Sequence, residues 1–251
     1  KDLRGLLTNV GGKFNGFTSY QEMVFYGRTL KGDLEKSLDF LSQLIMYPLI
    51  RDGDIKKQKG IVSQELNRSL DNPVTKFMYN CFQEAIFEKD HRRSIPILGT
   101  FESIEKTNSK VLQEFHQKNF NANNFVLVVC ANIPKEEIIG LTKKYFGEFK
   151  AGDRNQFKKC AIPKNFSVYS ENNPEIMQST INIYFDGYKA YSDKKFISDY
   201  LSIILGGTSN SRLHHEIRHK RGLAYSVGTR QYSSLDFGLF NLTTQVDQKN
   251  V

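Results

Sequence analysis

The same succession of predicted elements occurs twice in this chain, and the repetition restricts the folds that the chain can adopt. A helical stretch, a glycine and two runs rich in aromatic and β-branched residues occupy 3–31, and the same order returns at 211–246. Sequence identity between the two stretches is low, so the pattern alone repeats. Such a repeat predicts two similarly built domains, both of them incomplete in this chain.

The rest of the chain predicts an α+β fold, with helices packed on one side of a mostly antiparallel sheet. Leucines recur at helical spacing from Leu34 to Leu44, and Pro48 is expected to end that helix. Pro73 fits the first turn of a helix over 74–87. Further helices are predicted at 52–70, 109–120, 134–147, 193–207 and 211–220, and further strands at 124–131, 166–171, 179–188, 223–234 and 237–246.

The stretch KAGDRNQFKKCAIPK, residues 150–164, is polar and has no periodicity. We interpret it as a surface connection between domains. The predicted division is therefore 1–155 for the remainder of a first domain and 165–251 for the first part of a second.

Composition excludes several classes of protein. The 251 residues are 39% hydrophobic and 25% charged, which is typical of a globular protein. The net charge is +8, but the basic residues are scattered, so we expect no nucleic-acid partner. No apolar run approaches the roughly 20 residues of a membrane-spanning helix. The cysteines, Cys81, Cys130 and Cys160, are too widely spaced to predict a disulfide framework or a metal pair.

The ends of the chain predict a fragment. Lys1 lies inside a helical stretch without an initiator methionine, and Val251 follows a strand directly. The sequence indicates no cellular compartment.

The stretch SRLHHEIRHKRGLAYSV contains the pattern H-E-x-x-H at His215, Glu216 and His219. On an α-helix both histidines would share a face and could hold zinc, with the glutamate activating a water molecule. Zinc also needs a third protein ligand. The longer form of the motif has a histidine where this chain has Tyr225, and no glutamate follows Glu216.

The local charge also opposes a metal site on this helix. Arg218 lies inside the pattern, and His214 and Lys220 flank it, so a metal cation would meet positive charge. The alternative interpretation is a solvated basic helix whose histidines bind no metal, and we favour it.

The residues around this pattern resemble a known family. LGGTSNSRLHHEIRHKRGLAYSV resembles the second-domain segment of the M16, or pitrilysin-like, zinc peptidases, especially their mitochondrial-processing-peptidase-like branch, in which it typically reads LGGG-x-SSRL-hydrophobic-x-EIREKRGLAYSV. NVGGKFNGFTSYQEMVFY resembles the family's GG-x-x-NA-x-TS segment. DGDIKKQKGIVSQELNRSLDNP resembles the helix that supplies its last zinc ligand. The resemblance covers nearly all 251 residues.

The resemblance implies a Zn²⁺ site of which this chain holds one part. The family binds zinc with H-x-x-E-H, whose histidines are ligands and whose glutamate is the general base. A glutamate about 75 residues downstream completes the site, and Glu65 occupies that position. No H-x-x-E-H occurs in the chain. Counting back places it roughly a dozen residues before Lys1, so we expect an N-terminal truncation.

Glu65 has a simpler alternative, and one of its neighbours departs from the family. On a helix it shares a face with Gln58, Ile61 and Val62. The alternative is a surface glutamate that pairs with Arg68, three residues further on. The family usually carries a supporting glutamate where this chain has Gln58, and this departure favours reduced activity or none.

The resemblance also implies substrate-binding residues. Arg218 and Tyr225 match the pair that holds the substrate backbone and stabilises the anionic intermediate in the family, and both are good hydrogen-bond donors for an oxyanion. The alternative is that Arg218 faces solvent and Tyr225 packs in the core. Asn15 matches an edge strand to which substrate adds as an extra strand, or else it is an ordinary strand asparagine.

Two hypotheses about function remain besides the H-E-x-x-H zinc site. The first is a zinc endopeptidase that hydrolyses peptides held extended in a cleft between two domains, with this fragment itself inactive and binding no tight zinc. The second is a non-catalytic M16 homologue that acts as a scaffold or partner subunit. In either case a homodimer or heterodimer with another M16 chain is a candidate assembly.

Overall fold

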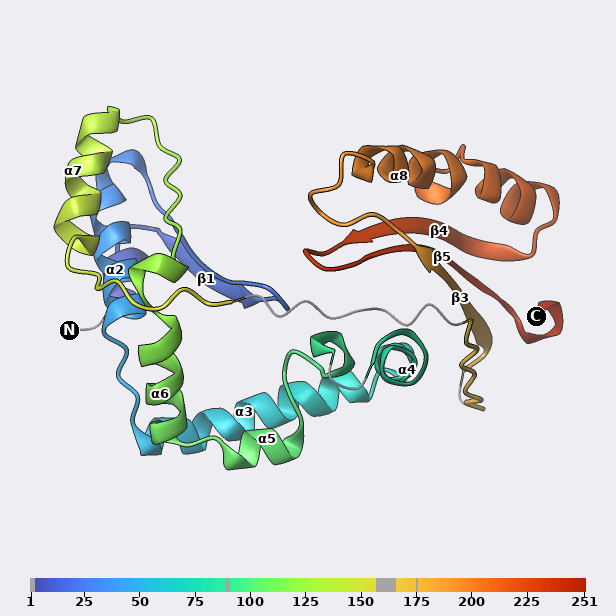
Figure 1. The fold of residues 1–251 in the computed structure, drawn as a ribbon, viewed down its shortest axis with the longest axis horizontal. Helices are drawn as coiled ribbons and strands as arrows, with labels where there is room; N and C mark the ends of the chain where they lie inside the picture. Colours follow the sequence, from blue (N-terminus) through green and yellow to red (C-terminus); the bar gives the residue numbers. More distant parts are fainter. Residues whose placement is uncertain (1–2, 89–90, 157–165, 175) are drawn as a thin grey trace. The chain divides into compact units, whose positions relative to one another are not determined.

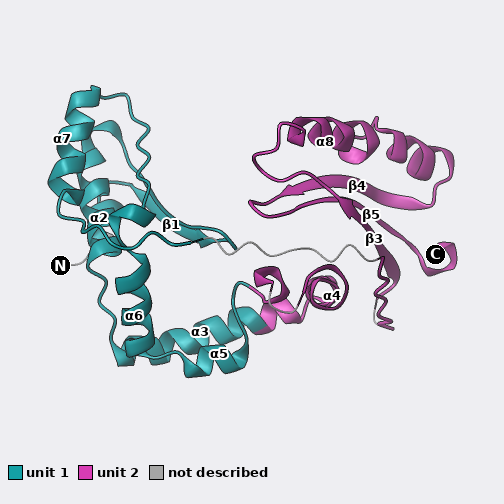
Figure 2. Ribbon diagram, viewed as in Figure 1, with its two compact units in different colours: residues 1–66, 97–157 teal, residues 67–96, 158–251 magenta. Residues whose placement is uncertain are grey.

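The computed structural model describes residues 3–88, 91–156, 166–174 and 176–251 (Figure 1). The chain divides into two compact units, which Figure 2 shows in two colours: Lys1–Leu66 with Ile97–Phe157, and Asn67–Pro96 with Lys158–Val251. Each has helices packed on an antiparallel sheet, which confirms the predicted α+β class. The domains 1–155 and 165–251 stay a prediction for the longer protein.

The first unit is built on a two-stranded sheet. Its elements are α1 (Leu3–Thr8), β1 (Lys13–Thr18), β2 (Met23–Arg28), η1 (Lys31–Asp33), α2 (Leu34–Met46), most of α3 (Asp52–Leu70), α5 (Phe101–Lys106), α6 (Ser109–Asn119), η4 (Ala122–Asn124) and α7 (Lys135–Phe146). As predicted, α1 stops at a glycine: Gly11 has a φ of 68°, a left-handed conformation that other residues adopt at a cost.

Helix α2 provides the core of the first unit. Its buried face carries Leu38, Leu41 and Ile45 at helical spacing, and the helix ends before Pro48 as predicted. The ring of Phe40 also lies on this core and contacts Phe14 of β1, with ring centroids 4.8 Å apart. Burying each such side chain stabilises the fold by about 1.5–3 kcal/mol.

The predicted buried strand at 124–131 is wrong. Residues 125–131 belong to no strand of the structure, and the side chains of Val126 and Val128 are 84% and 83% exposed. The run has high β-propensity, but a strand needs a hydrogen-bonding neighbour, and none of the described residues provides one. The structure likewise shows no strand at 166–171.

The second unit is built on a three-stranded antiparallel sheet in the order β3-β5-β4. Its elements are α4 (Pro73–Cys81), η2 (Phe82–Ile86), η3 (Arg92–Ser94), β3 (Gln178–Asp186), α8 (Lys195–Ser202), η5 (Ile203–Gly207), η6 (His214–Lys220), β4 (Ala224–Ser233), β5 (Gly238–Asp247) and η7 (Gln248–Asn250). Helix α4 begins at Pro73 as predicted, with the side chain of Asn72 accepting a hydrogen bond from the amide of Thr75 at 3.0 Å.

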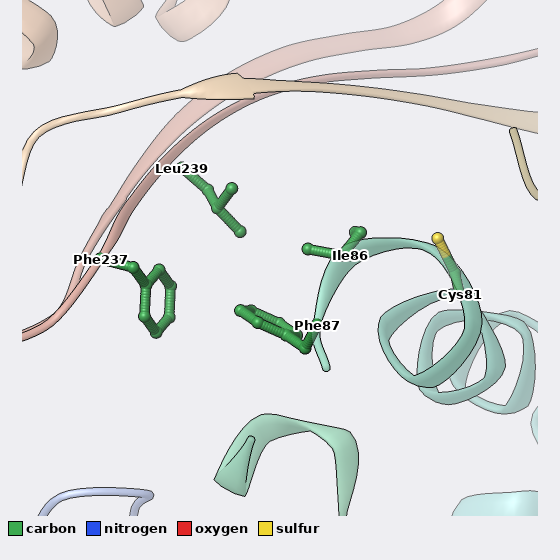
Figure 3. Packing of buried hydrophobic residues seen from close by; sticks show 5 residues of the cluster. All are labelled: Cys81, Ile86, Phe87, Phe237 and Leu239. Atoms are coloured by element: carbon green, nitrogen blue, oxygen red, sulfur yellow. The ribbon is translucent and has the colours of Figure 1, made fainter. Parts of the chain in front are cut away.

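Both faces of this sheet are covered, whereas the sequence predicts helices on one face only. Helix α8 lies on one face (Figure 1), where Ser202 hydrogen-bonds Thr229 of β4. On the other face, Figure 3 shows Ile86 and Phe87 beside Phe237 and Leu239. Residues 67–96 therefore pack with the second unit although they lie in the first half of the chain.

A buried polar cluster reinforces that packing. His91 is completely buried, and its ring stacks on Phe87 with centroids 4.2 Å apart. Its Nδ1 accepts a hydrogen bond from the amide of Arg93 at 3.1 Å, and its Nε2 lies 3.8 Å from a carboxylate oxygen of Asp236. Arg92 donates to the same carboxylate at 2.8 Å. A charged network of this kind joins η3 to the end of the β4–β5 hairpin.

Several predicted helices change their hydrogen bonding within their length. η2, η5 and η6 are π-type turns, and the first two directly follow α4 and α8. Most of the predicted connection, residues 157–164, lies outside the described residues.

Acid should destabilise this packing through His91. Burial lowers the pKa of its imidazole. The negative charge of Asp236 raises this pKa, the positive charges of Arg92 and Arg93 lower it further, and Glu88 raises it. A lowered pKa in the folded state means that the stabilisation is present above the unfolded pKa of about 6.5 and is lost as the pH falls through the folded value. We predict that lowering the pH from 7.5 to 5.5 reduces the free energy of unfolding less in His91→Phe than in the wild type. Urea denaturation at the two pH values measures this difference.

The exposed His215 gives the matched control. His215→Phe should keep the pH dependence of the wild type. Equal pH dependence in the wild type and His91→Phe would contradict the assignment.

Candidate functional site

The candidate metal ligand, Glu65, lies on the exposed surface of α3 in the first unit. Its carboxylate makes no ion pair or hydrogen bond with any described residue, so the predicted alternative of a pair with Arg68 does not form. Gln58, seven residues earlier, is also exposed, as is Ile61. A carboxylate without a partner on an open helix face is available to a cation.

Glu65 alone cannot hold a metal ion. Among the described residues no group of three histidine, cysteine, aspartate or glutamate side chains is arranged to bind one. A tetrahedral zinc site needs three or four protein ligands. The side chain of Glu65 therefore fits zinc as one donor, and at least two more would have to come from residues that this structure does not contain.

The structure brings Arg218 and Tyr225 together in the second unit. The guanidinium carbon of Arg218 lies 4.5 Å from the centre of the Tyr225 ring, a cation–π contact. The arginine is half-buried on η6, and Tyr225 is 79% exposed on β4. The predicted alternative, in which Tyr225 packs in the core, is wrong.

Local backbone geometry explains this arrangement. Gly222 has a φ of 62°, and this left-handed residue turns the chain from η6 into β4. The register of β4 on β5 then shifts between Ala224 and Ser226, so Tyr225 is the extra residue of a β-bulge. The bulge leaves both Tyr225 and Ser226 exposed between the buried Ala224 and Val227, and the Tyr225 ring lies against Arg218.

The H-E-x-x-H pattern adopts a geometry different from the one that a zinc helix requires. Residues His214–Lys220 form a π-type turn, in which positions four apart no longer align as on an α-helix. Glu216 pairs with Lys220 at 2.7 Å, and the hydrogen bond from Lys220 lowers the pKa of the Glu216 carboxyl. His219 Nε2 lies 3.3 Å from the carbonyl oxygen of Ser209. These contacts support the interpretation of a basic surface helix.

Asn15 lies on β1, opposite Tyr26 of β2. Phe14 reaches the core at Phe40, so alternation along the strand places Asn15 on the other face. Its side-chain oxygen accepts a hydrogen bond from the amide of Gly16 at 2.8 Å. Within the described residues the second edge of β1 has no strand partner, as a substrate-binding edge requires.

The buried cluster around His91 was not predicted from the sequence. The one sequence feature that marks this cluster is a histidine followed by two arginines, a pattern that is common on protein surfaces. Only the fold brings Asp236 to it across 145 residues of chain. Among the helices that the structure describes, none is long and apolar enough to cross a membrane.

Comparisons with known proteins agree with these observations. Residues 1–100 match the family described as insulinase (peptidase family M16), and residues 106–251 match the peptidase M16 inactive domain. A Rickettsia bellii protein named "Uncharacterized zinc protease" is 31% identical over 235 residues, which are 93% of this chain and 56% of that protein. The chain thus spans about half the length of the curated relatives that it matches.

Solved structures show the same fold. A protease from Helicobacter pylori superposes with a TM-score of 0.85 at 18% identity, over 98% of this chain and 60% of that one. A structure from Pseudomonas fluorescens, described as a peptidase M16 inactive domain, gives a TM-score of 0.83 at 18% identity, over 98% of this chain and 60% of that one.

The exposed position of Tyr225 predicts a small effect on stability. Tyr225→Phe keeps the ring under Arg218 and removes a hydroxyl that hydrogen-bonds no described residue, so the free energy of unfolding should change by less than about 0.5 kcal/mol. Tyr225→Ala should cost about 0.5–1 kcal/mol through the lost cation–π contact. Chemical denaturation measures both. A loss above about 2 kcal/mol in Tyr225→Phe would show that the hydroxyl has a structural role.

Proposed function

The chain belongs to the M16 peptidase family, and on this premise we propose that the longer protein is a zinc-dependent endopeptidase. Its substrates are peptides held extended in a cleft between two domains. Residues 1–251 contain no H-x-x-E-H motif, and by themselves we expect them to be inactive and to bind no tight zinc. The relatives named as zinc proteases support the proposal at the level of the family.

The contact between Arg218 and Tyr225 is the observation that carries this proposal. Stacking on the ring restrains the guanidinium at 4.5 Å, and the bulge leaves the phenol in solvent. Both side chains are hydrogen-bond donors held in place before substrate arrives. Donors arranged in advance stabilise the negative charge that develops on a peptide carbonyl oxygen as it is attacked.

Glu65 is proposed as the last zinc ligand. Its carboxylate is exposed and unpaired among the described residues, and its charge suits a cation. Bound zinc would polarise the scissile carbonyl and lower the pKa of a water molecule. Gln58 shares a helix face with Glu65. Its amide can orient a neighbouring group by hydrogen bonding but adds no negative charge.

The free edge of β1 is proposed to bind the peptide backbone. An extended peptide can add to such an edge through main-chain hydrogen bonds, which give affinity with little dependence on sequence. Asn15 lies on this strand and offers an amide group beside that edge. The natural substrate is accordingly defined here as an extended peptide, without a sequence.

A non-catalytic homologue is the second candidate function. It is favoured by Gln58, which stands where the family usually has a glutamate, and the match of residues 106–251 to an M16 inactive domain is compatible with it. Such a protein would act as a scaffold or as the partner subunit of another M16 chain, in a homodimer or heterodimer. An intact H-x-x-E-H upstream of Lys1 would favour the enzyme, and its absence would favour the scaffold.

Removing the charge of Glu65 tests the metal assignment. In the protein extended upstream of Lys1, Glu65→Gln should weaken zinc binding by at least about 100-fold, because a neutral amide is a poor zinc ligand. Metal titration with a competing chelator measures this loss. Glu114→Gln, at an exposed glutamate on α6, is the matched control and should change nothing.

The same titration separates the H-E-x-x-H alternative. His215→Ala with His219→Ala should leave zinc affinity unchanged. Loss of zinc in this double variant but not in Glu65→Gln would favour a site on η6. Chelator-sensitive cleavage of peptides by residues 1–251 alone would also refute the proposed ligand set.

Substitutions at the Arg218–Tyr225 pair test transition-state stabilisation. Arg218→Lys and Tyr225→Phe should each lower kcat of the extended protein by about 10²–10³ with a smaller change in KM, because the first replaces the planar guanidinium with an ammonium that cannot keep its position and the second removes the phenol donor. Arg230 lies 5.0 Å from the Tyr232 ring on the same strand and gives a matched control. Arg230→Lys and Tyr232→Phe should keep kcat. Equal losses at both pairs would indicate a general effect on the sheet.

A further inference from the structure

Two cations lie directly opposite each other on the sheet of the first unit. The antiparallel register pairs Lys13, at the start of β1, with Arg28, at the end of β2. Directly opposite residues of an antiparallel pair have side chains on the same face, with Cβ atoms roughly 4.5–5.5 Å apart. Like charges at that separation repel each other and destabilise the sheet unless an anion binds between them.

The face that carries these two cations points away from the core of the first unit. Phe14, the residue after Lys13, contacts Phe40 of α2 with ring centroids 4.8 Å apart. Gly27, the residue before Arg28, lies opposite Phe14 and therefore shares its core-facing side. Alternation along each strand directs both cations to the other face, and both are exposed.

No described carboxylate neutralises this charge. Among the residues that the structure describes, neither Lys13 nor Arg28 forms an ion pair. The other positions of the same face are uncharged, because Asn15 lies opposite Tyr26, and Phe17 lies opposite Val24. The positive charge is thus concentrated at one end of an otherwise neutral face.

The donors at this end suit a carboxylate. A guanidinium can donate two parallel hydrogen bonds to one carboxylate, and an ammonium group can donate a third. A neutral amide offers a single acceptor oxygen and no charge. The end of the face that carries Lys13 and Arg28 therefore favours a carboxylate over the amide of the same shape.

The free edge of β1 brings this end within reach of a bound peptide. A peptide added to that edge presents every second side chain on the face of Lys13 and Asn15. Because these residues are two apart, the peptide residue beside Lys13 is two positions from the one beside Asn15. Arg28 is one strand further away, roughly 10 Å from the peptide, a gap that its long side chain and a glutamate can close together.

We propose that Lys13 and Arg28 form a specificity subsite that binds a carboxylate of the peptide substrate. The carboxylate belongs either to an acidic side chain within the peptide or to its C-terminus, since both present the same acceptor. This subsite rests on the proposed function, because it requires an extended peptide on the edge of β1. It adds a charge preference to a substrate that main-chain pairing alone leaves undefined.

Peptide binding to the protein extended upstream of Lys1 tests the subsite. The probes are short fluorescent peptides with one central glutamate or glutamine, each with a free or an amidated C-terminus. Fluorescence anisotropy at low salt, with a chelator present to prevent cleavage, measures Kd. The wild type should bind a peptide with the recognised carboxylate at least about 10-fold more tightly than the neutral peptide.

Removing both cations should remove this preference. Lys13→Gln with Arg28→Gln should bind charged and neutral peptides within about 2-fold of each other. Lys110→Gln with Lys118→Gln removes the same charge from exposed lysines of α6 and should keep the preference. A preference for central glutamate identifies a side chain as the source of the carboxylate, and a preference for the free C-terminus identifies the terminal carboxylate.

Equal Kd values for charged and neutral peptides in the wild type would overturn the proposal, as would an equal loss of preference in the α6 control. Cleavage is a separate readout. A carboxylate preference without chelator-sensitive cleavage would refute the peptidase and keep the subsite, whereas cleavage without the preference would refute the subsite alone.

Thermal unfolding shows whether the doubly substituted protein keeps its fold. Its midpoint should equal or exceed that of the wild type, because the substitutions remove repulsion between like charges. A midpoint lower by more than about 5 °C would give Lys13 and Arg28 a structural role and contradict the subsite.

Discussion

Hydrogen bonding of β5 on both of its edges is the constraint on which the second unit depends. A central strand satisfies its backbone groups only when both neighbours are present. Once β3 and β4 are in register with β5, Ala224 and Val246 lie opposite each other and pack against Leu213 and Ile217. That packing holds η6 against the sheet and thereby fixes the position from which Arg218 extends.

The contact between Arg218 and Tyr225 lies at one irregularity in this sheet. Without the bulge at Tyr225, alternation along β4 would continue unbroken from the buried Ala224. The bulge lets one residue leave the alternation while the ladder resumes at Ser226. For the substrate-binding role proposed for Tyr225, a rigid sheet is a suitable base because it does not reorganise when charge develops nearby.

Sequence patterns predicted the elements whose stabilising partners are local. The period of α2, the glycine after α1 and the proline at the start of α4 act within a few residues, and all three were confirmed. The family resemblance predicts a substrate-binding role for Arg218 and Tyr225. The cation–π contact between them lies at a bulge that no sequence signal indicates. The role of Glu65 remains a proposal that the exposed carboxylate supports.

The failures have a different origin. The run at 124–131 has the composition of a strand, but a strand exists only when another backbone pairs with it. The covering of the second sheet by residues 67–96 depends on contacts between Phe87 and Phe237, which are 150 positions apart. Periodicity within one segment contains no information about a partner at that distance. For the same reason it could not place His91 beside Asp236.

The proposed function requires Glu65 to be one ligand of a zinc centre whose other ligands precede Lys1. Anomalous diffraction at the zinc absorption edge, from crystals of the protein extended upstream, tests it most directly. The account predicts one zinc ion with a carboxylate oxygen of Glu65 at about 2.0–2.2 Å and two imidazole nitrogens from upstream histidines. Zinc held by His215 and His219, or by ligands that leave Glu65 uncoordinated, would contradict it.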